Sequence, residues 1–523
     1  MALALSTPGG TQSLPKDIDT NPKKARAWIE SLPLTKTADS ARAVTDNIRA
    51  LNRAKLPSDQ RVELLEIYRP VLTVLLDELD AIYAYSVLPM PAKQLEAFTL
   101  AQDLLIECAY TYKLLLLEKT GKLVMFNAKK NLPLPLYRAM SCLSALMLQS
   151  YKTYHPILPG LWQDFHSLYL FSIEQNLRDE IVDADSKQTV SELYTAALLL
   201  SLADPYRLMH KEVERVTQII AQNRGLTVLR DNADGLDPQR LMVVALDSDQ
   251  PPKILVQATR PTGQVLRLVD TGRLVERLQE RVKAASSAGN IAKSHATHDV
   301  NDLMERLIRL WGDPPKRQFR RNAAVTGVAL CSGIKGIAYF AELAANEDPL
   351  ADAEAIRAGR TIPLLKMPQD ALSQQIGVEE WQVLNQSASG LRMHRESGGK
   401  VGITVGEVVG VRFVGGQAWS VGIVRWLTLL EGDALEFGLE LISPAATGIT
   451  IEPTITSGTR PMPALLIAPL MGDLGGDSIL AAPDTFADLR EYALVDHDSV
   501  RHVRATTLIE RTSRFDLFQF QAS

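Results

Sequence analysis

The chain has little cysteine and lacks long apolar runs. Its 523 residues include three cysteines, Cys108, Cys142 and Cys331, too few and too far apart for a disulfide framework. The best apolar runs, such as 196–202, fall far short of the roughly 20 residues that a membrane-spanning helix needs. The first 14 residues lack the basic start and apolar core of a secretory signal. We therefore expect a soluble cytoplasmic protein with reduced thiols and no membrane span.

The chain also lacks an excess of positive charge and the common catalytic motifs. A net charge of -5 argues against broad nucleic-acid binding, which requires a basic face. Neither a phosphate-binding G-x-x-x-x-G-K-[ST] motif, nor H-E-x-x-H, nor G-x-S-x-G occurs. His295 and His298 stand without a neighbouring cysteine or acidic cluster, so they favour surface histidines in a hinge over a metal site. We expect no enzyme and no metal centre.

The length and composition indicate several folded domains. A chain of 523 residues is too long for one ordinary core, so roughly two to four domains are expected. The patterns predict a multidomain α+β protein with an N-terminal all-α domain, a small β-rich module and a C-terminal β-barrel with extra strands. The predicted segments are a disordered tail (1–20), a helical domain (21–224), a small α/β linker module (225–312), the barrel (313–452) and a β extension (453–523).

The helical domain is predicted from apolar spacing. Asn21 and Pro22 are typical of a helix start, with an N-cap followed by proline at the first helical position. Apolar residues then recur mostly at spacings of three and four, which indicates helices. The domain is either a bundle or a stack of helical hairpins. Its predicted helices cover about 39–54, 59–84, 91–119, 134–153, 160–176, 189–203 and 205–222.

The pattern changes after Gly225. Short runs at 241–246, 254–257 and 265–269 predict strands, separated by Asp, Gly and Pro residues that favour turns. Two further helices are expected at about 271–285 and 299–311, on either side of a small, polar hinge. We interpret this region as a small α/β module that links the helical domain to the barrel.

A cationic segment follows the proline pair at 314–315. Lys316, Arg317, Arg320 and Arg321 place four cations in six positions, and Arg317 and Arg321 form an R-x-x-x-R motif. An arginine can donate two parallel hydrogen bonds to a phosphate or to the O6 and N7 atoms of guanine. The same spacing occurs at Arg49/Arg53 and at Arg273/Arg277. Those contexts are helical, and we interpret both pairs as solvated residues on one helix face.

A second motif, N-x-S-x-x-G, is formed by Asn385, Ser387 and Gly390. If it opens a strand, Asn385 and Ser387 point the same way, because side chains alternate with period two. An amide and a hydroxyl would then lie together, ready to bond a guanine edge or a phosphate. Gly390 would allow a turn or a close approach of the ligand. Strand patterns at 405–413, 417–426 and 435–442 follow, and their spacing suggests a small closed barrel.

The order of these features resembles that of PilZ domains, six-stranded β-barrels that bind the bacterial second messenger cyclic di-GMP. The resemblance implies that Arg317 and Arg321 clamp the ligand, with Lys316 and Arg320 as additional candidates. It implies that Asn385, Ser387 and Gly390 line the barrel side. It also implies cyclic di-GMP as the ligand, with no other cofactor. The helical domain would then dock a protein partner in motility, biofilm or exopolysaccharide control, and a homo-oligomer is conceivable.

One departure from the family pattern leaves a second reading open. Arg321 and Asn385 are 64 positions apart, farther than in simple PilZ domains, and the excess predicts an inserted helical segment at about 341–378. Such an insertion leaves the barrel possible if its ends stay close. The alternative is a helical scaffold whose barrel no longer binds ligand. The strand-like residues 453–523 either extend the barrel or form a second β module, and their arginines (Arg501, Arg504, Arg511 and Arg514) suggest a solvated face.

Overall fold

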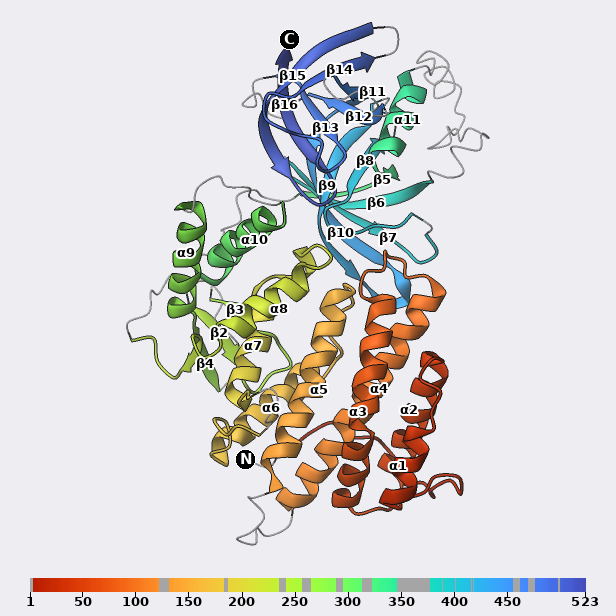
Figure 1. The fold of residues 1–523 in the computed structure, drawn as a ribbon, viewed down its shortest axis with the longest axis vertical. Helices are drawn as coiled ribbons and strands as arrows, with labels where there is room; N and C mark the ends of the chain where they lie inside the picture. The colour runs from red at the N-terminus through yellow and green to blue at the C-terminus, as the bar shows by residue number, and fades with distance from the viewer. Residues whose placement is uncertain are drawn as a thin grey trace. The chain divides into compact units, whose positions relative to one another are not determined.

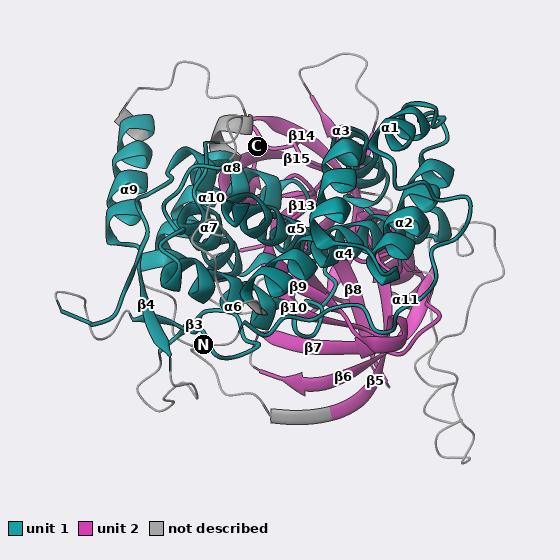
Figure 2. Cartoon of the chain, turned by 90° about the horizontal axis from the view of Figure 1, so that it is seen from below, with its two compact units in different colours: residues 1–86, 90–205, 210–316 teal, residues 87–89, 206–209, 317–523 magenta. Residues whose placement is uncertain are grey.

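A computed structural model describes most of the chain (Figure 1). The chain divides into two compact units (Figure 2), and each is described by itself. Unit 1 holds residues 1–86, 90–205 and 210–316, and unit 2 holds residues 87–89, 206–209 and 317–523. The described residues are 3–121, 131–182, 187–234, 241–255, 265–287, 295–312, 322–345, 377–387, 389–399, 401–414, 416, 418–454, 461–468, 476–496 and 499–523.

Unit 1 begins with a series of helices whose ends follow local sequence signals. The Asn21 side chain accepts hydrogen bonds from the backbone N–H groups of Lys23 and Lys24, which confirms the predicted start of α1. Thr189 and Glu192 form a reciprocal capping box at the start of α7. The helices are α1 (Pro22–Glu30), α2 (Thr37–Arg53), α3 (Ser58–Tyr83), α4 (Ala92–Gly121), α5 (Pro133–Lys152), α6 (Leu161–Glu174), α7 (Val190–Leu202) and α8 (Glu212–Gln222).

Two details of this region differ from the sequence-based expectation. The helix expected over 205–222 is broken, because Lys211 adopts a left-handed backbone (φ 71°) and α8 begins only at Glu212. The segment expected to be a disordered tail is bonded to the helices at Ser6 and Gln12. The Ser6 N–H donates to Asp164 Oδ1 at 3.0 Å, and the Gln12 N–H donates to the Arg53 carbonyl at 2.8 Å. These long-range bonds bind the segment to the helices.

The small α/β module is built into unit 1. Its sheet has the strand order β1-β4-β2-β3, and helices α9 and α10 follow it. Asp249 accepts from the N–H groups of Gly160 and Gln163 at the start of α6, at 2.6 and 3.0 Å. Trp311 of α10 is fully buried and donates to the Leu199 carbonyl of α7 at 3.1 Å. The sequence suggested a linker, but these bonds join the module to the helices.

The elements of this module are short strands and two amphipathic helices. Helix α10 begins at His295, so His295 and His298 lie in its first turn and not in a hinge. Among the described residues, no group of His, Cys, Asp and Glu is arranged to hold a metal ion. The elements are β1 (Val228–Arg230), β2 (Met242–Ala245), β3 (Lys253–Ile254), β4 (Leu266–Asp270), α9 (Gly272–Ser287) and α10 (His295–Gly312).

Unit 2 contains a closed six-stranded barrel with the order β10-β7-β6-β5-β8-β9. Its interior is filled by alternate residues of each strand, as expected for a small barrel. Trp381, Val383, Met393 and Phe437 are among these buried side chains, and the rings of Trp381 and Phe437 meet edge to face at 4.9 Å. The strands are β5 (Asn322–Ser332), β6 (Val378–Gln386), β7 (Gly390–Arg395), β8 (Val408–Phe413), β9 (Ser420–Leu429) and β10 (Leu435–Ser443).

A second closed six-stranded barrel follows at once, with the order β11-β12-β13-β16-β15-β14. The C-terminal region therefore forms a second β module and does not extend the first barrel. The strands are β11 (Ala446–Pro453), β12 (Met462–Ile467), β13 (Ser478–Ala481), β14 (Glu491–Asp496), β15 (Ser499–Arg511) and β16 (Asp516–Ala522). The predicted α+β class, with helices first and barrels last, is confirmed.

Helix α11 (Ile334–Ala345) joins the two barrels (Figure 1). One hydrophobic core contains Ile337 and Phe340 of α11, Trp419 from the first barrel, and Leu465 and Phe515 from the second. A Cβ atom on Gly448 of β11 would lie 2.9 Å from the Ala338 Cβ, so glycine permits this close packing. The remainder of the predicted insertion, 346–376, lies outside the described residues. Its helical content stays a prediction.

Candidate functional site

The N-x-S-x-x-G motif lies at a hairpin between β6 and β7. Asn385 is the penultimate residue of β6, and Gly390 begins β7. The Ser387 N–H donates to the Gly390 carbonyl at 2.8 Å, and its hydroxyl lies 3.3 Å from the same oxygen. The motif therefore closes one strand and opens the next, and the prediction of a single strand through Asn385 and Ser387 was wrong. Periodicity alone does not reveal where a strand turns.

Gly390 lies where the chain is crowded. A Cβ atom there would lie 3.2 Å from the Ser387 hydroxyl and 3.4 Å from the Leu439 carbonyl oxygen. The neighbouring Ser389 carbonyl accepts from the Leu441 N–H at 2.8 Å, which ties the turn to β10. Glycine lets the turn lie close to Leu439, and the hairpin is held in one conformation. A rigid turn presents polar side chains with little entropic cost on binding.

The arginine segment leads directly into the strand that pairs with this hairpin. In β5, Asn322 pairs with Gln386 and Ala323 pairs with Asn385. Arg321 immediately precedes Asn322 in the sequence. The predicted residues Lys316, Arg317, Arg320 and Arg321 themselves lie outside the described residues. The structure therefore brings together Asn385, Ser387 and Gly390, and shows which strand the cationic segment enters.

Strand register adds side chains that sequence reasoning missed. Asn385 pairs with Arg392 of β7, Arg392 with Gly438 of β10, and Gly438 with Trp426 of β9. The neighbouring pair, Val383 and Met393, is fully buried, and Arg392 alternates with Met393 along β7, so Arg392 faces outward. A register shift between Val383 and Asn385 breaks this alternation in β6; Asn385 and Trp426 are half-buried, and Gly438 is buried. We call Asn385, Arg392, Gly438 and Trp426 the outer row. It continues the polar surface of the hairpin across four strands.

Two contacts fix the outer row. A Cβ atom on Gly438 would lie 1.8 Å from Trp426 Nε1, so the indole occupies the space that a side chain at 438 would fill. Arg392 donates to Glu436 Oε2 from Nε at 3.1 Å and from Nη2 at 2.5 Å. The row thus presents an indole, an oriented guanidinium and an amide, which suit a base plane and its hydrogen-bonding edge. Only the strand register could have revealed it.

Arg425, at a bulge beside the outer row, bonds the first barrel to the second. The register of β9 and β10 shifts between Gly438 and Leu439, opposite Arg425. Arg425 donates to Glu440 at 2.5 Å and to both oxygens of Glu510 in β15, at 2.7 and 2.9 Å. Burial lowers the pKa of this guanidinium, but the carboxylates of Glu510 and Glu440 outweigh it and raise the pKa overall. Arg425 therefore stays charged and joins the barrels.

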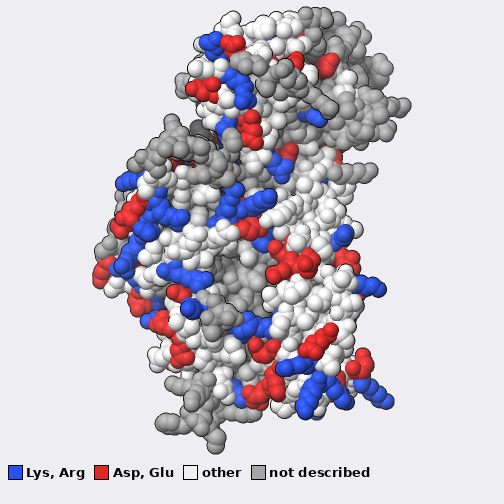
Figure 3. Space-filling model, in the orientation of Figure 1, with Lys and Arg blue, Asp and Glu red and all other residues white. Residues whose placement is uncertain are grey.

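The C-terminal arginines are mostly neutralised. Arg504 pairs with Glu491 at 2.6 Å, Arg511 with the buried Asp516 at 3.0 Å, and Arg514 with Glu407 at 3.5 Å. On the face shown in Figure 3, basic and acidic side chains are interspersed. None of the helices in the described ranges has the length and apolar character that crossing a membrane requires. Three of the four arginines that suggested a solvated face therefore take part in ion pairs.

Comparison with known proteins agrees with this architecture. Residues 23–233 match the family described as the N-terminal domain of the cyclic-di-GMP receptor FimW. Residues 241–361 and 366–448 match the middle PilZ domain of that receptor. The barrel with its N-x-S-x-x-G hairpin is thus a PilZ domain, and the chain belongs to the PilZ-domain family.

A curated relative is similar in sequence over most of the chain. The chain is 23% identical over 501 residues to the cyclic-di-GMP receptor FimW of Pseudomonas aeruginosa, covering 85% of this chain and 81% of the relative. No solved structure matches the chain. The family assignment, which the sequence analysis reached from two short motifs, is confirmed.

Proposed function

We propose that this protein is a cyclic di-GMP receptor that passes ligand binding at its PilZ barrel to a partner of its helical region. The family assignment and the similarity to FimW support the ligand. We assign the clamp to Arg317 and Arg321, with Lys316 and Arg320 beside them. The barrel side would consist of Asn385, Ser387 and Gly390. The proposed role is binding and signalling in the cytoplasm, without catalysis, in motility, biofilm or exopolysaccharide control.

One observation carries the assignment of the site. The residue that follows Arg321 is Asn322, and Asn322 pairs with Gln386, which stands between Asn385 and Ser387. Paired residues of an antiparallel ladder lie about 4.5–5.5 Å apart at their Cα atoms. A cationic segment that enters the barrel there starts within reach of the hairpin. The two motifs, 64 positions apart in the sequence, then belong to one site.

The chemistry of the residues fits cyclic di-GMP, which carries two phosphates and two guanines. Each arginine fork can bond a phosphate or the Hoogsteen edge of guanine. Trp426 offers a surface on which a base can stack, and the outer row continues from it through Arg392 to Asn385. Differential affinity for two arrangements of the arginine segment would transmit the signal.

Calorimetric titration with cyclic di-GMP tests the proposal. The wild-type protein and an Arg317→Ala/Arg321→Ala variant are compared. Each lost charge-assisted bond costs about 1.5–3 kcal/mol. The double variant should therefore bind roughly 100-fold more weakly or worse. The matched control is Arg273→Ala/Arg277→Ala, with the same spacing on α9, where Arg277 pairs with Glu280 at 3.4 Å. It should bind as wild type.

The other outcomes are equally informative. No heat from folded wild-type protein would establish the alternative, a helical scaffold with a barrel that does not bind. Equal loss in both double variants would show that general charge, and not the PilZ segment, holds the ligand. Binding by wild type that survives Arg317→Ala/Arg321→Ala would place the site elsewhere.

A further inference from the structure

A cavity of about 240 Å³ lies in unit 1, away from the barrel site, between α5, α7 and α8. The turn after α8 closes one side of it. Its apolar lining comes from Leu148 of α5, from Leu199 and Leu200 of α7, and from Ile220 of α8. Leu199, Leu200 and Ile220 are buried and Leu148 is half-buried, so an occupant meets an apolar wall that suits an apolar group best.

The size of the cavity argues for a side chain as the occupant. Sites that enclose small-molecule ligands measure roughly 300–1,000 Å³. A cavity of about 240 Å³ is smaller, and would hold an anchoring residue or two. Anchors of this kind, buried in a pocket, supply most of the affinity in many protein interfaces.

Cationic groups lie at the edge of the cavity. Arg224 lines it and is exposed to solvent. Arg281 of α9 donates to Gln222 Oε1 at 3.2 Å, and Gln222 stands between the lining residues Ala221 and Asn223. An acidic group also lines the cavity: Glu192 Oε2 accepts from the Thr189 N–H at 3.1 Å in the capping box of α7. Two guanidinium groups and one carboxylate therefore lie at the cavity, and this excess of one cation complements negative charge.

A buried hydroxyl in the lining lacks a partner. Thr227 is 7% exposed, and its hydroxyl makes no hydrogen bond in the described structure. Buried polar groups without partners are uncommon and costly, by about 1–3 kcal/mol. The hydroxyl oxygen is itself shielded from solvent, so an occupant of the cavity reaches it only if the wall rearranges.

We propose that this cavity binds a segment of a partner protein in which an apolar anchor residue is flanked by acidic residues. The inference rests on the proposed function, because that function gives the helical region to a protein partner. The anchor enters between α7 and α8. The acidic flank meets Arg224 and Arg281. This charge complementarity favours an acidic segment over a neutral or basic one.

A displayed library of random 12-residue peptides, panned on the full-length protein, tests the inference. We expect enrichment of peptides with a large apolar residue next to Asp or Glu. Selected peptides are then titrated against Ala196→Trp, which fills the cavity, and against Arg224→Glu, which reverses the charge of an exposed edge residue. Both variants should bind at least 10-fold more weakly. Arg224→Glu keeps the test valid even if the larger side chain at 196 disturbs folding.

Several results would overturn the inference. These are no enrichment, enrichment of basic or neutral peptides, or binding by both variants with the affinity of the wild-type protein. Tight binding of free indole, lost in Ala196→Trp, would assign the cavity to a small molecule instead. Cyclic di-GMP is titrated into the same variants and should bind as to wild type. A protein that binds peptides but no cyclic di-GMP would refute the proposed function and leave this site standing.

Discussion

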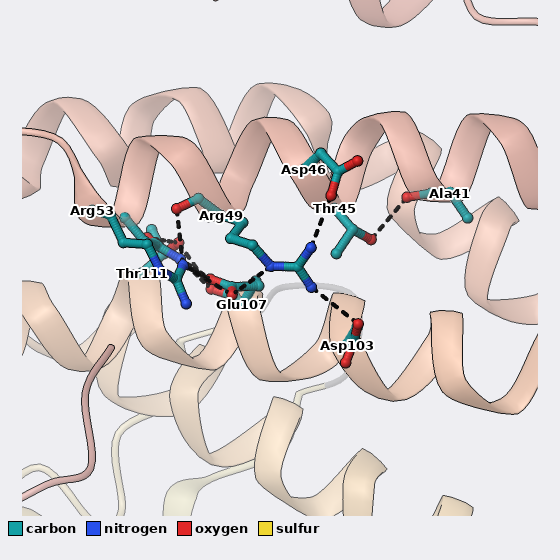
Figure 4. Close-up of polar contacts among 9 residues, drawn as sticks. Ala41, Thr45, Asp46, Arg49, Arg53, Asp103, Glu107 and Thr111 are labelled. Atoms are coloured by element: carbon teal, nitrogen blue, oxygen red, sulfur yellow. Dashed lines mark hydrogen bonds and ion pairs between the residues drawn. The ribbon is translucent and has the colours of Figure 1, made fainter. Parts of the chain in front are cut away.

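The Nη1 atom of Arg53 in α2 lies 3.0 and 3.1 Å from the two carboxylate oxygens of Glu107 in α4 (Figure 4). Arg49 Nε reaches the same carboxylate at 3.3 Å, and Asn52 donates to it at 2.9 Å. The Glu107 side chain is only 4% exposed. The sequence pattern alone predicts that Arg49 and Arg53 are solvated residues on a helix face. They instead satisfy a buried charge that holds α2 against α4.

Glu107→Ala should destabilise the helical unit strongly. Removing the carboxylate leaves the partly buried guanidinium of Arg53 and the buried Asn52 amide without their main partner. Breaking one side of a buried ion pair costs about 3–5 kcal/mol. Urea unfolding followed by far-ultraviolet circular dichroism measures the change. Asp46→Ala is the control, because Asp46 is exposed and pairs only with Arg49 at 2.8 Å among the bonds drawn in Figure 4. It should cost less than about 1 kcal/mol.

Acidification should destabilise unit 1 through His166. Burial lowers the pKa of this imidazole to about 4, although Asp249 and Asp247 favour its charged form. Its Nε2 lies 2.9 Å from the Gln250 carbonyl, so Nε2 carries the proton, and Nδ1 accepts from the Tyr194 hydroxyl at 2.7 Å. Between about pH 6.5 and 4, His166 is protonated in the unfolded chain but stays neutral in the folded chain. The free energy of unfolding should therefore fall by about 1.4 kcal/mol per pH unit between pH 6.5 and 4.

The control for this prediction is His166→Gln, which keeps a donor and an acceptor but does not titrate. Unfolding is measured at several pH values in both proteins, so that the carboxylates common to both cancel. The slope of stability against pH should be smaller in the variant by about one proton. Identical slopes would mean that His166 does not couple folding to pH.

Trp426→Ala should weaken cyclic di-GMP binding without unfolding the barrel. The indole is partly exposed on the outer row, and stacking of a base on an aromatic side chain contributes about 1–3 kcal/mol. The loss corresponds to roughly 5-fold to 150-fold in affinity. Trp426→Phe should keep most of the affinity, because it keeps an aromatic surface. Unchanged binding by Trp426→Ala would exclude the outer row from the site.

Gly438→Ala tests the outer row through the residue that the Trp426 indole covers. The added Cβ atom would lie 1.8 Å from Trp426 Nε1, so the indole must move. We expect weaker ligand binding together with a shift in tryptophan fluorescence. Gly432→Ala is the control for the loss of a glycine, because its Cβ would meet nothing within 4 Å, although its positive φ of 69° costs some stability. An unshifted spectrum in Gly438→Ala would contradict the packing described.

Arg425 and Glu510 should be energetically coupled across the two barrels. Their bidentate pair, at 2.7 and 2.9 Å, involves side chains that are partly buried. A double-mutant cycle with Arg425→Gln and Glu510→Gln should give a coupling of about 1–2 kcal/mol. The Arg504/Glu491 pair, within the second barrel, is more exposed and should give less than about 1 kcal/mol. A coupling near zero between Arg425 and Glu510 would show that their pair does not stabilise the contact between the barrels.

The sequence by itself determined the elements that depend on neighbours along the chain. The helix expected at 134–153 is α5 (Pro133–Lys152), and the Asn21 cap was recognised from two residues. Helix periodicity, caps and proline breaks act over three or four residues, so a linear reading captures them. The motifs that contain Arg317 and Asn385 can likewise be recognised in the sequence, and together they suggest the PilZ family.

Only the tertiary structure decided what depends on pairing between distant residues. The turn of the N-x-S-x-x-G hairpin, the outer row from Asn385 to Trp426 and the second barrel follow from strand register, which is non-local. The partnership of Arg53 with Glu107 joins residues 54 positions apart. No periodic pattern records such a contact, because burial and charge pairing are settled only when separate segments pack together.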